Sequence, residues 1–190
     1  MAHVSIIGTG TMGQAIAGLA TQGGHTVQSI GHHDTSAVTG DVVVLAVPYA
    51  ALSEIAGARR DELTDKVVVD VSNPVDFQTF DGLTVDADGS ATAELAAALP
   101  QSRVVKAFNT NFGATLASGT VGDLPTTVLV AGDDADAKAA VSELVTTGGL
   151  VAVDAGSLKR ARELEALGLL QITLAAGERI SWTGGFGVVS

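Results

Sequence analysis

The chain has 190 residues, of which 46% are hydrophobic and only 16% are charged, and its formal net charge is −11. This length predicts one domain, or one domain with a small appendage. The acidic balance argues against nucleic acid or an anionic membrane surface as a partner, and the absence of cysteine excludes disulfides, thiolate catalysis and cysteine-based metal sites.

The apolar residues occur as short Val, Ala and Leu runs separated by Gly, Asp and Pro, and no run reaches the roughly 18 residues of a membrane span. Short runs of this kind are typical of strands that helices bury on both faces. The first predicted strand begins within a few residues of Met1, which leaves no room for a signal or transit peptide. We therefore expect a cytoplasmic α/β protein with no membrane partner.

The first thirty residues predict a strand, a glycine turn, a helix and a second strand. Residues 3–7 are an apolar run, 14–22 read as a helix, and 25–30 read as the next strand. Between them lies a GxGxxG turn made of Gly8, Thr9, Gly10, Thr11, Met12 and Gly13. In a dinucleotide-binding βαβ unit the first glycine makes the turn, the second admits the pyrophosphate, and the third lets the helix pack closely. We expect dinucleotide binding here, with a purely structural glycine turn as the alternative.

The rest of the chain alternates strands with helices. Residues 31–40 are too short and too polar for an ordinary crossover helix, so the second helix of the fold is expected to be reduced or missing. Further strands are predicted at 41–47, 66–71, 103–108, 126–132 and 150–153, and helices at 49–58, 90–99, 135–146 and 157–176. Ser90 and Asp134 are expected to cap their helices. The segment 75–89 is expected to be an excursion with one short strand, 112–123 to contain one or two helical turns, and the glycine-rich tail 180–190 to hold at most one or two edge strands.

This alternation predicts an α/β fold with a doubly wound, mostly parallel, Rossmann-type sheet. We expect a dinucleotide-binding domain over residues 1–122. A small C-terminal part over residues 123–190 is expected to complete the sheet and cover the cleft.

Ligands of such sheets bind at the carboxyl ends of the strands, where the strand order reverses. The predicted strand ends therefore define the candidate site. They are Gly8 to Gly13, His32 and His33, Val47-Pro48-Tyr49, Ser72-Asn73-Pro74, and Phe108-Asn109-Thr110.

The two adjacent histidines follow the strand that reads the adenosine ribose. An acidic residue at the end of that strand favours NAD, whereas donor or cationic groups accommodate the 2′-phosphate of NADP. We interpret His32 and His33 as phosphate donors and expect NADP. Two solvated loop histidines are the alternative. A metal site is not expected, because adjacent histidines without further ligands make a poor set.

The predicted strand ends carry few groups that can move a proton. Reduction of a carbonyl places a His, Lys or Tyr beside the reacting carbon, whereas hydride exchange between a nicotinamide and a second redox ring needs mainly orientation and exclusion of water. Lys106 lies within its strand and is interpreted as an edge or phosphate-facing lysine, with a general acid as the alternative. We expect direct hydride transfer with no catalytic side chain.

Two other titratable residues have structural interpretations. His25 is expected at a helix–strand junction. Glu165 is expected to be a partly buried, hydrogen-bonded carboxylate, with a ligand or dimer contact as the alternative. Its spacing places it on one helical face with Leu158, Ala161, Leu169 and Ile172.

Six blocks in order resemble the family of NADP-dependent reductases of the deazaflavin coenzyme F420. They are residues 8–13, Leu45-Ala46-Val47-Pro48-Tyr49, Asp70-Val71-Ser72-Asn73-Pro74, Val105-Lys106-Ala107-Phe108-Asn109-Thr110, Ala131-Gly132-Asp133-Asp134 and Val153-Asp154-Ala155-Gly156-Ser157-Leu158. The same module resembles the cytoplasmic domains of metalloreductases that pass hydride from NADPH to a flavin.

This resemblance implies NADPH along the glycine turn and a deazaflavin or flavin stacked on the nicotinamide beside Pro48, Asn73 and Asn109. Members of the family follow the second strand with Ser or Thr and Arg, where this chain has Gly31-His32-His33-Asp34.

The leading hypothesis is an NADP-dependent oxidoreductase that exchanges hydride with coenzyme F420 or a flavin. One alternative is an NADPH-dependent reductase of a small imine or carbonyl, with Lys106 or Tyr49 as proton donor. Another is a dinucleotide-binding sensor module without turnover. The apolar tail around Trp182 and Phe186 makes a homodimer a reasonable expectation.

Overall fold

The computed structural model describes residues 1–189, so Ser190, the last residue of the predicted C-terminal part, lies outside the described residues. Within this range seven strands form one sheet in the order β2-β1-β3-β4-β5-β8-β9. They are β1 (His3–Ile7), β2 (Thr26–Ile30), β3 (Val42–Leu45), β4 (Val67–Asp70), β5 (Arg103–Lys106), β8 (Thr127–Gly132) and β9 (Val151–Gly156). Neighbouring strands are parallel except β5 and β8. The predicted mostly parallel sheet is confirmed.

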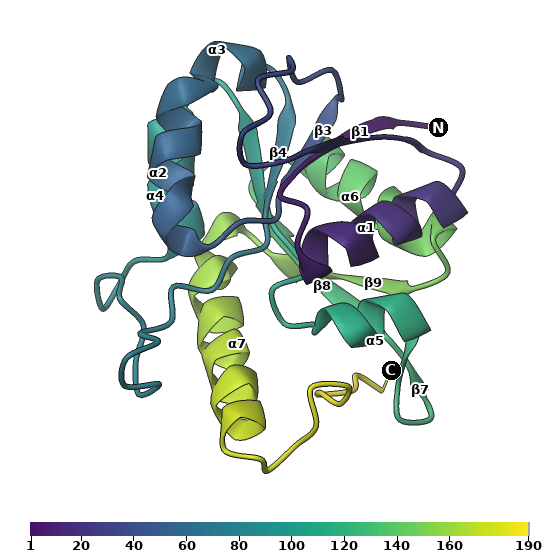
Figure 1. Cartoon of the computed structure of the whole chain (residues 1–190), viewed down its shortest axis with the longest axis vertical. Helices are drawn as coiled ribbons and strands as arrows, with labels where there is room; N and C mark the ends of the chain where they lie inside the picture. Colours follow the sequence, from purple (N-terminus) through teal and green to yellow (C-terminus); the bar gives the residue numbers. More distant parts are fainter. Residues whose placement is uncertain (190) are drawn as a thin grey trace.

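Helices cover both faces of the sheet, as a doubly wound fold requires. In Figure 1, α2 and α4 lie on one side, while α1 and α6 lie on the other, with α5 below α1. The helices are α1 (Thr11–Gln22), α2 (Tyr49–Ala58), α3 (Arg60–Leu63), α4 (Ala91–Ala98), α5 (Gly113–Ser118), α6 (Ala135–Thr147) and α7 (Ala161–Ala176), with a 3-10 turn η1 (Leu158–Arg160) before α7.

Alternation along the valine-rich strands produces two separate cores. Val105 points to the core that contains Ile16 of α1 and Val141 of α6, whereas its neighbour Val104 points to the core that contains Leu95 of α4. Both valines are buried. Because successive side chains of a strand face opposite sides, a strand that is apolar on every residue needs a helix layer on each face.

The segment between β2 and β3 contains no helix, as predicted. Side chains from elsewhere hold its backbone instead: Arg59 donates to the carbonyl oxygens of Asp34 and Ser36, and Glu62 accepts from the N–H of Val38 at 2.7 Å. The missing helix is therefore replaced by an extended segment. Arg59, which lies between α2 and α3, and Glu62 of α3 hold this segment in place.

Several local elements differ from the prediction. α1 begins at Thr11, inside the glycine motif, rather than at Gln14. The short helix α3 and the hairpin of β6 (Thr120–Val121) with β7 (Leu124–Pro125) were not predicted. The segment 75–89 holds only an isolated bridge between Val75 and Leu83.

The C-terminal part extends the same sheet and then crosses back over it. β8 pairs with β5, and β9 pairs with β8. After α7 the tail contains no strand up to residue 189 and runs toward the β6–β7 hairpin (Figure 1). In the tail, Trp182 packs on Phe112 at the start of α5 with ring centroids 5.0 Å apart. None of the helices in the described part of the chain has the length and apolar character needed to cross a membrane.

Candidate functional site

The turn after β1 depends on glycine for conformation and for space. Gly8 has φ +112°, and a Cβ on it would lie 2.1 Å from the carbonyl oxygen of Ala46. A Cβ on Gly13 would lie 2.0 Å from the carbonyl oxygen of Gly8. A side chain at either position would push β1 away from β3, or α1 away from the turn. These two glycines therefore have the geometry that the motif assigns to the turn and to close helix packing.

Gly10 differs from the other two glycines because the space in front of it is open. A Cβ on Gly10 would meet no heavy atom within 4 Å, and its φ is −74°. Gly10 is also the N-cap residue of α1, where no side chain accepts from the first turn and no acidic residue lies in that turn. The N–H groups that begin α1 thus have no side-chain cap, and the space in front of Gly10 is open, a combination that suits a phosphate dianion.

The glycine turn lies where the strand order reverses. β2 lies on one side of β1 and β3 on the other, so the crevice opens at the carboxyl ends of β1 and β3. Val47 is half-buried and Pro48, the N-cap residue of α2, is exposed. Thr9, Gly10 and Thr11 are exposed as well. These residues make the accessible part of the predicted site.

His32 and His33 lie just beyond the end of β2, and both are exposed. Their ring centroids are 4.5 Å apart. The end of β2 touches the glycine turn, because Gly8 N–H donates to the carbonyl oxygen of Ile30 at 2.9 Å. Next to the histidines, hydrogen bonds from the side chain and backbone of Ser36 lower the pKa of the exposed Asp34 carboxyl group. The pair therefore lies at the end of β2, beside a carboxylate that is hydrogen-bonded within its own turn.

The ends of β4 and β5 are joined by two asparagines. Asn73 donates from Nδ2 to the carbonyl oxygen of Asn109 at 2.8 Å, and Asn109 donates from Nδ2 to Asn73 Oδ1 and to the carbonyl oxygen of Leu164 in α7, both at 2.9 Å. Just before this pair, Phe108 is fully buried in the left-handed region with φ +65°. Backbone in this strained region clusters at functional sites in proteins.

Part of the predicted site is closed off from solvent. Ser72, Pro74 and Asn109 are buried, whereas Asn73 is half-buried. Ser72 Oγ and Asn109 Oδ1 are also buried polar atoms with no hydrogen-bond partner among the described residues. Unpaired buried polar atoms are costly, and native proteins keep few of them. The site therefore has an open half at β1 and β3 and a closed half at β4 and β5.

Lys106 is neither an edge residue nor a phosphate-facing one, so that interpretation was wrong. Its side chain is fully buried, and Nζ lies 2.9 Å from Asp70 Oδ2, 2.9 Å from Glu165 Oε1 and 2.6 Å from the carbonyl oxygen of Ser72. Lys106 Nζ donates hydrogen bonds to Asp70 and to Ser72 and forms an ion pair with Glu165. Lys106 and Asp70 are register partners at the ends of β5 and β4. Both charges lie on the α4 face, on which Val104 also lies.

Glu165 completes this group of charges from α7. Its carboxylate accepts from the N–H of Ala91 at 3.0 Å and from the N–H of Thr92 at 3.3 Å, so it caps the start of α4 together with Ser90. The prediction of a hydrogen-bonded carboxylate is confirmed, although Glu165 is fully rather than partly buried. Asp70 and Thr92 were not singled out from the sequence. The sequence signal for this cluster was a charged residue at the end of each of two valine-rich strands.

His25 has the predicted structural position at the junction of α1 and β2. Nδ1 accepts from the N–H of Ala2 at 3.0 Å, and Nε2 lies 2.9 Å from Thr147 Oγ1 of α6. The ring is buried and lies away from the carboxyl ends of the strands.

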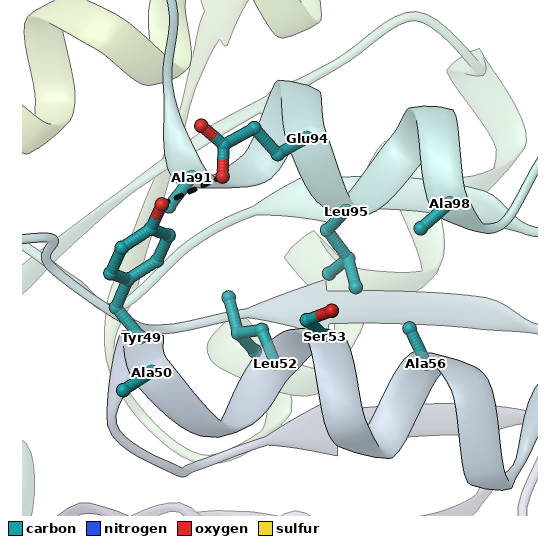
Figure 2. Close-up of a pocket in the computed structure, with 9 residues that line it drawn as sticks. All are labelled: Tyr49, Ala50, Leu52, Ser53, Ala56, Ala91, Glu94, Leu95 and Ala98. Atoms are coloured by element: carbon teal, nitrogen blue, oxygen red, sulfur yellow. Dashed lines mark hydrogen bonds between the residues drawn. The ribbon is translucent and has the colours of Figure 1, made fainter. Parts of the chain in front are cut away.

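Tyr49 is bonded away from the crevice. Its hydroxyl donates to Glu94 Oε2 at 2.7 Å, and this hydrogen bond, with burial and the nearby negative charge, raises the pKa of Tyr49 to about 12. Figure 2 shows the pair at one end of a groove of about 350 Å³ between α2 and α4, lined largely by alanine and leucine side chains such as Leu52 and Leu95. This groove runs between the two helices rather than along the glycine turn.

The reversal of strand order beside an open glycine turn defines a Rossmann-type α/β fold. The family model described as "NADP oxidoreductase coenzyme F420-dependent" matches residues 26–74. The F420-dependent NADP reductase of Methanocaldococcus jannaschii is 31% identical over 153 residues, which cover 78% of this chain and 68% of that protein. The chain belongs to this family of oxidoreductases.

Two further similarities agree with this assignment. Metalloreductase STEAP3 of Rattus norvegicus is 37% identical over 128 residues, which cover 67% of this chain but only 24% of that protein. A solved structure from Arthrobacter sp. FB24, described as a candidate F420-dependent NADP reductase, covers all of both chains with a TM-score of 0.84 and 24% identity. The similarity to this solved structure supports the fold alone. The chain thus spans about two thirds of the archaeal reductase and about a quarter of the metalloreductase.

Proposed function

We propose that this chain binds NADP(H) along the turn from Gly8 to Gly13 and exchanges hydride between its nicotinamide and a deazaflavin, coenzyme F420, or a flavin. The observation that carries the proposal is the glycine turn at the β1–β3 crevice, with open space at Gly10 and uncapped N–H groups at the start of α1. Membership of the family supports NADP as the dinucleotide and coenzyme F420 as its partner. A flavin is included as an alternative acceptor because the chain also resembles metalloreductases.

The residues present fit a dinucleotide. In the proposal, the N–H groups of Thr11, Met12 and Gly13 hold the pyrophosphate, helped by the positive end of α1. The nicotinamide lies near Val47 and Pro48, with Ser72, Asn73, Pro74 and Asn109 forming the wall behind it. A bound nicotinamide supplies the hydride, and the protein supplies orientation and a site shielded from water.

No catalytic side chain is needed for this transfer, and the two residues considered as proton donors are engaged elsewhere. Lys106 donates to Asp70 and to the carbonyl oxygen of Ser72 and forms an ion pair with Glu165 in a buried cluster, and the Tyr49 hydroxyl is bound to Glu94. An imine or carbonyl reductase that used either residue would have to break these bonds. Turnover of a small imine that is abolished in Tyr49→Phe would support that alternative instead.

The test uses a pair of glycine substitutions on one helix. Gly10→Ala adds a methyl group in the open space, so the protein should fold normally and lose NADPH binding. Gly18→Ala adds the same methyl group, also into open space, on a later turn of α1 and serves as the control. NADPH binding is measured by calorimetry. Hydride transfer is measured as loss of NADPH absorbance with coenzyme F420, FMN and FAD in turn.

The expected result is transfer to at least one of these acceptors in the unaltered protein and in Gly18→Ala, with both binding and transfer lost in Gly10→Ala. If NADPH binds but hydride is transferred to none of these acceptors, the proposed activity is contradicted. The dinucleotide-binding sensor module then remains as the interpretation. No binding of NADPH at all would contradict the site.

We further propose that His32 and His33 set the preference for NADP by donating to the 2′-phosphate. The support is their exposed position beyond β2, next to the strand end that touches the glycine turn. Replacing both with alanine should weaken NADPH binding and leave NADH binding unchanged. An equal loss for both nucleotides would contradict the assignment.

A cytoplasmic homodimer is part of the same proposal. Its support is the exposed apolar surface of the tail, where Trp182 is 53% and Phe186 is 42% exposed. Light scattering coupled to size exclusion measures the mass, and a monomer at micromolar concentration would contradict it.

A further inference from the structure

The helix α7 meets the strand ends through a single turn. The carbonyl oxygen of Leu164 accepts from Asn109, the carboxylate of Glu165 forms an ion pair with Lys106 and accepts from the N–H of Ala91, and a Cβ on Gly168 would lie 2.3 Å from Asn73 Oδ1. All three residues are buried, and they lie on one face of the helix. This turn therefore fixes how α7 lies against the sheet.

The charged cluster also fixes the loop after β4. The N–H of Ser72 donates to Asp70 Oδ1 at 2.8 Å, and the carbonyl oxygen of Ser72 accepts from Lys106 Nζ at 2.6 Å. The peptide groups on both sides of Ser72 are thus held by charged side chains. The next residue, Asn73, carries the side chain that touches Asn109 and Gly168. One cluster therefore sets the position of the loop and of the helix that packs on it.

Stability alone does not explain such a cluster. Removing three charges from water is costly, and apolar residues of similar volume often stabilise a core as well or better. The best-attested use of buried polar groups is to select one arrangement of the packed elements. Here the selected arrangement is that of α7, the β4 loop and the start of α4, whereas no hydrogen bond or ion pair within residues 1–189 joins the glycine turn to these charges.

We propose that Glu165 and Lys106 are positioning residues for hydride transfer, an inference that rests on the proposed function. They hold α7 and the Ser72-Asn73 loop in the one geometry that presents the acceptor ring to the nicotinamide. They touch neither ring, and they do not contribute to holding NADPH on the glycine turn. Their loss therefore slows transfer without weakening NADPH binding.

The fluorescence of Trp182 in the tail measures the position of α7 independently of enzymatic activity. The tail continues from α7, and its Trp182, the single tryptophan of the chain, packs on Phe112 at the start of α5. Movement of α7 pulls this tail, so the emission of Trp182 and its quenching by acrylamide follow the docking of the helix.

The experiment compares Glu165→Gln with Glu163→Gln, the same change two residues away in the exposed pair of Glu163 with Arg160. For Glu165→Gln we expect the NADPH dissociation constant to stay unchanged. We expect kcat to fall by about tenfold to a hundredfold, because misplaced reacting groups react more slowly. We also expect Trp182 to become more accessible to acrylamide. For Glu163→Gln we expect no change in any of the three. Val141→Ala in α6, a core substitution away from this cluster, controls for loss of stability.

A kcat in Glu165→Gln that falls no further than in Val141→Ala would overturn the proposal, as would an equal loss of NADPH binding. If Glu165→Gln does not fold, Gly168→Ala decides the question, because its methyl group displaces α7 from Asn73 without removing a charge. Gly168→Ala should show the same fall in kcat with NADPH binding intact, and unchanged kcat would overturn the proposal.

Failure of the proposed function gives a different result. In that case the unaltered protein transfers no hydride to any acceptor, and Trp182 accessibility still tests whether Glu165 holds α7. Equal quenching in Glu165→Gln and Glu163→Gln would then reject the positioning role by itself.

Discussion

The two halves of the candidate site are built in different ways. At the ends of β1 and β3 the site is made of backbone, with Gly8 in the left-handed region, Gly10 open to solvent and no side chain capping α1. At the ends of β4 and β5 it is made of buried side chains, with Lys106 hydrogen-bonded to Asp70 and Ser72 and ion-paired with Glu165. In the proposed function, the open half takes up the pyrophosphate without rearrangement, whereas the closed half fixes the geometry of α7 and the loop after β4.

The largest expected effect comes from breaking the closed half. Lys106→Met leaves Asp70 and Glu165 buried beside each other without a cation, so it should lower the free energy of unfolding by about 3–5 kcal/mol. Chemical denaturation monitored by circular dichroism measures this loss. Lys159→Met, at an exposed position of η1, is the control. Equal stability of the two variants would mean that the cluster is not held as described.

Breaking the open half should have a smaller effect on stability. Gly8→Ala places a side chain at φ +112° and against the carbonyl oxygen of Ala46, so we expect a loss of more than about 1 kcal/mol together with loss of NADPH binding. Gly10→Ala should lose binding alone. Thermal unfolding and calorimetry on both variants separate the two effects, and a stable Gly8→Ala that binds NADPH would contradict the geometry of the turn.

The smallest effect on stability is expected at the exposed ion pair of Lys138 with Asp154. This pair serves as a reference for the buried cluster of Lys106. Lys138 Nζ lies 2.7 Å from Asp154 Oδ2, whose side chain is 60% exposed. The hydrogen bond from Lys138, followed by that from the N–H of Gly156, lowers the pKa of Asp154. Because the folded-state pKa is below the unfolded one, this stabilisation is present above about pH 4 and is lost as the pH falls through the lowered pKa.

The contribution of Asp154 should stay below about 1 kcal/mol, because solvent screens an exposed pair. Urea unfolding of the unaltered protein and of Asp154→Asn should therefore give curves that differ slightly at neutral pH and converge in acid. Asp123→Asn, on the exposed turn between β6 and β7, is the matched control. If the difference in unfolding free energy between the unaltered protein and Asp154→Asn grew as the pH fell, the result would contradict this prediction.

Local sequence patterns predicted the long elements well. The apolar runs marked every strand of the main sheet, and Ser90 and Asp134 cap α4 and α6 as expected, with hydrogen bonds from the N–H groups of Ala93 and Ala137. The polar stretch 31–40 was too short for a helix, and none forms. These features follow from side-chain periodicity and chain length, which are properties of a local segment.

Short elements and buried charges were harder to predict. α3 has four residues and each strand of the β6–β7 hairpin has two, which is too short to show a period. Lys106 looked like an edge residue because a buried lysine needs partners that lie far away in the chain. Asp70 and Glu165 become neighbours of Lys106 only when β4 pairs with β5 and α7 packs on α4.

The sequence by itself determined the glycine turn and the alternation of strands and helices, because each depends on residues that are close together in the chain. Only the tertiary structure decided the direction of β8, the burial of Ser72 and Asn109, and the union of Lys106, Asp70 and Glu165. The physical reason is that a buried charge is tolerable only beside its partners, and those partners are brought together by packing rather than by sequence spacing.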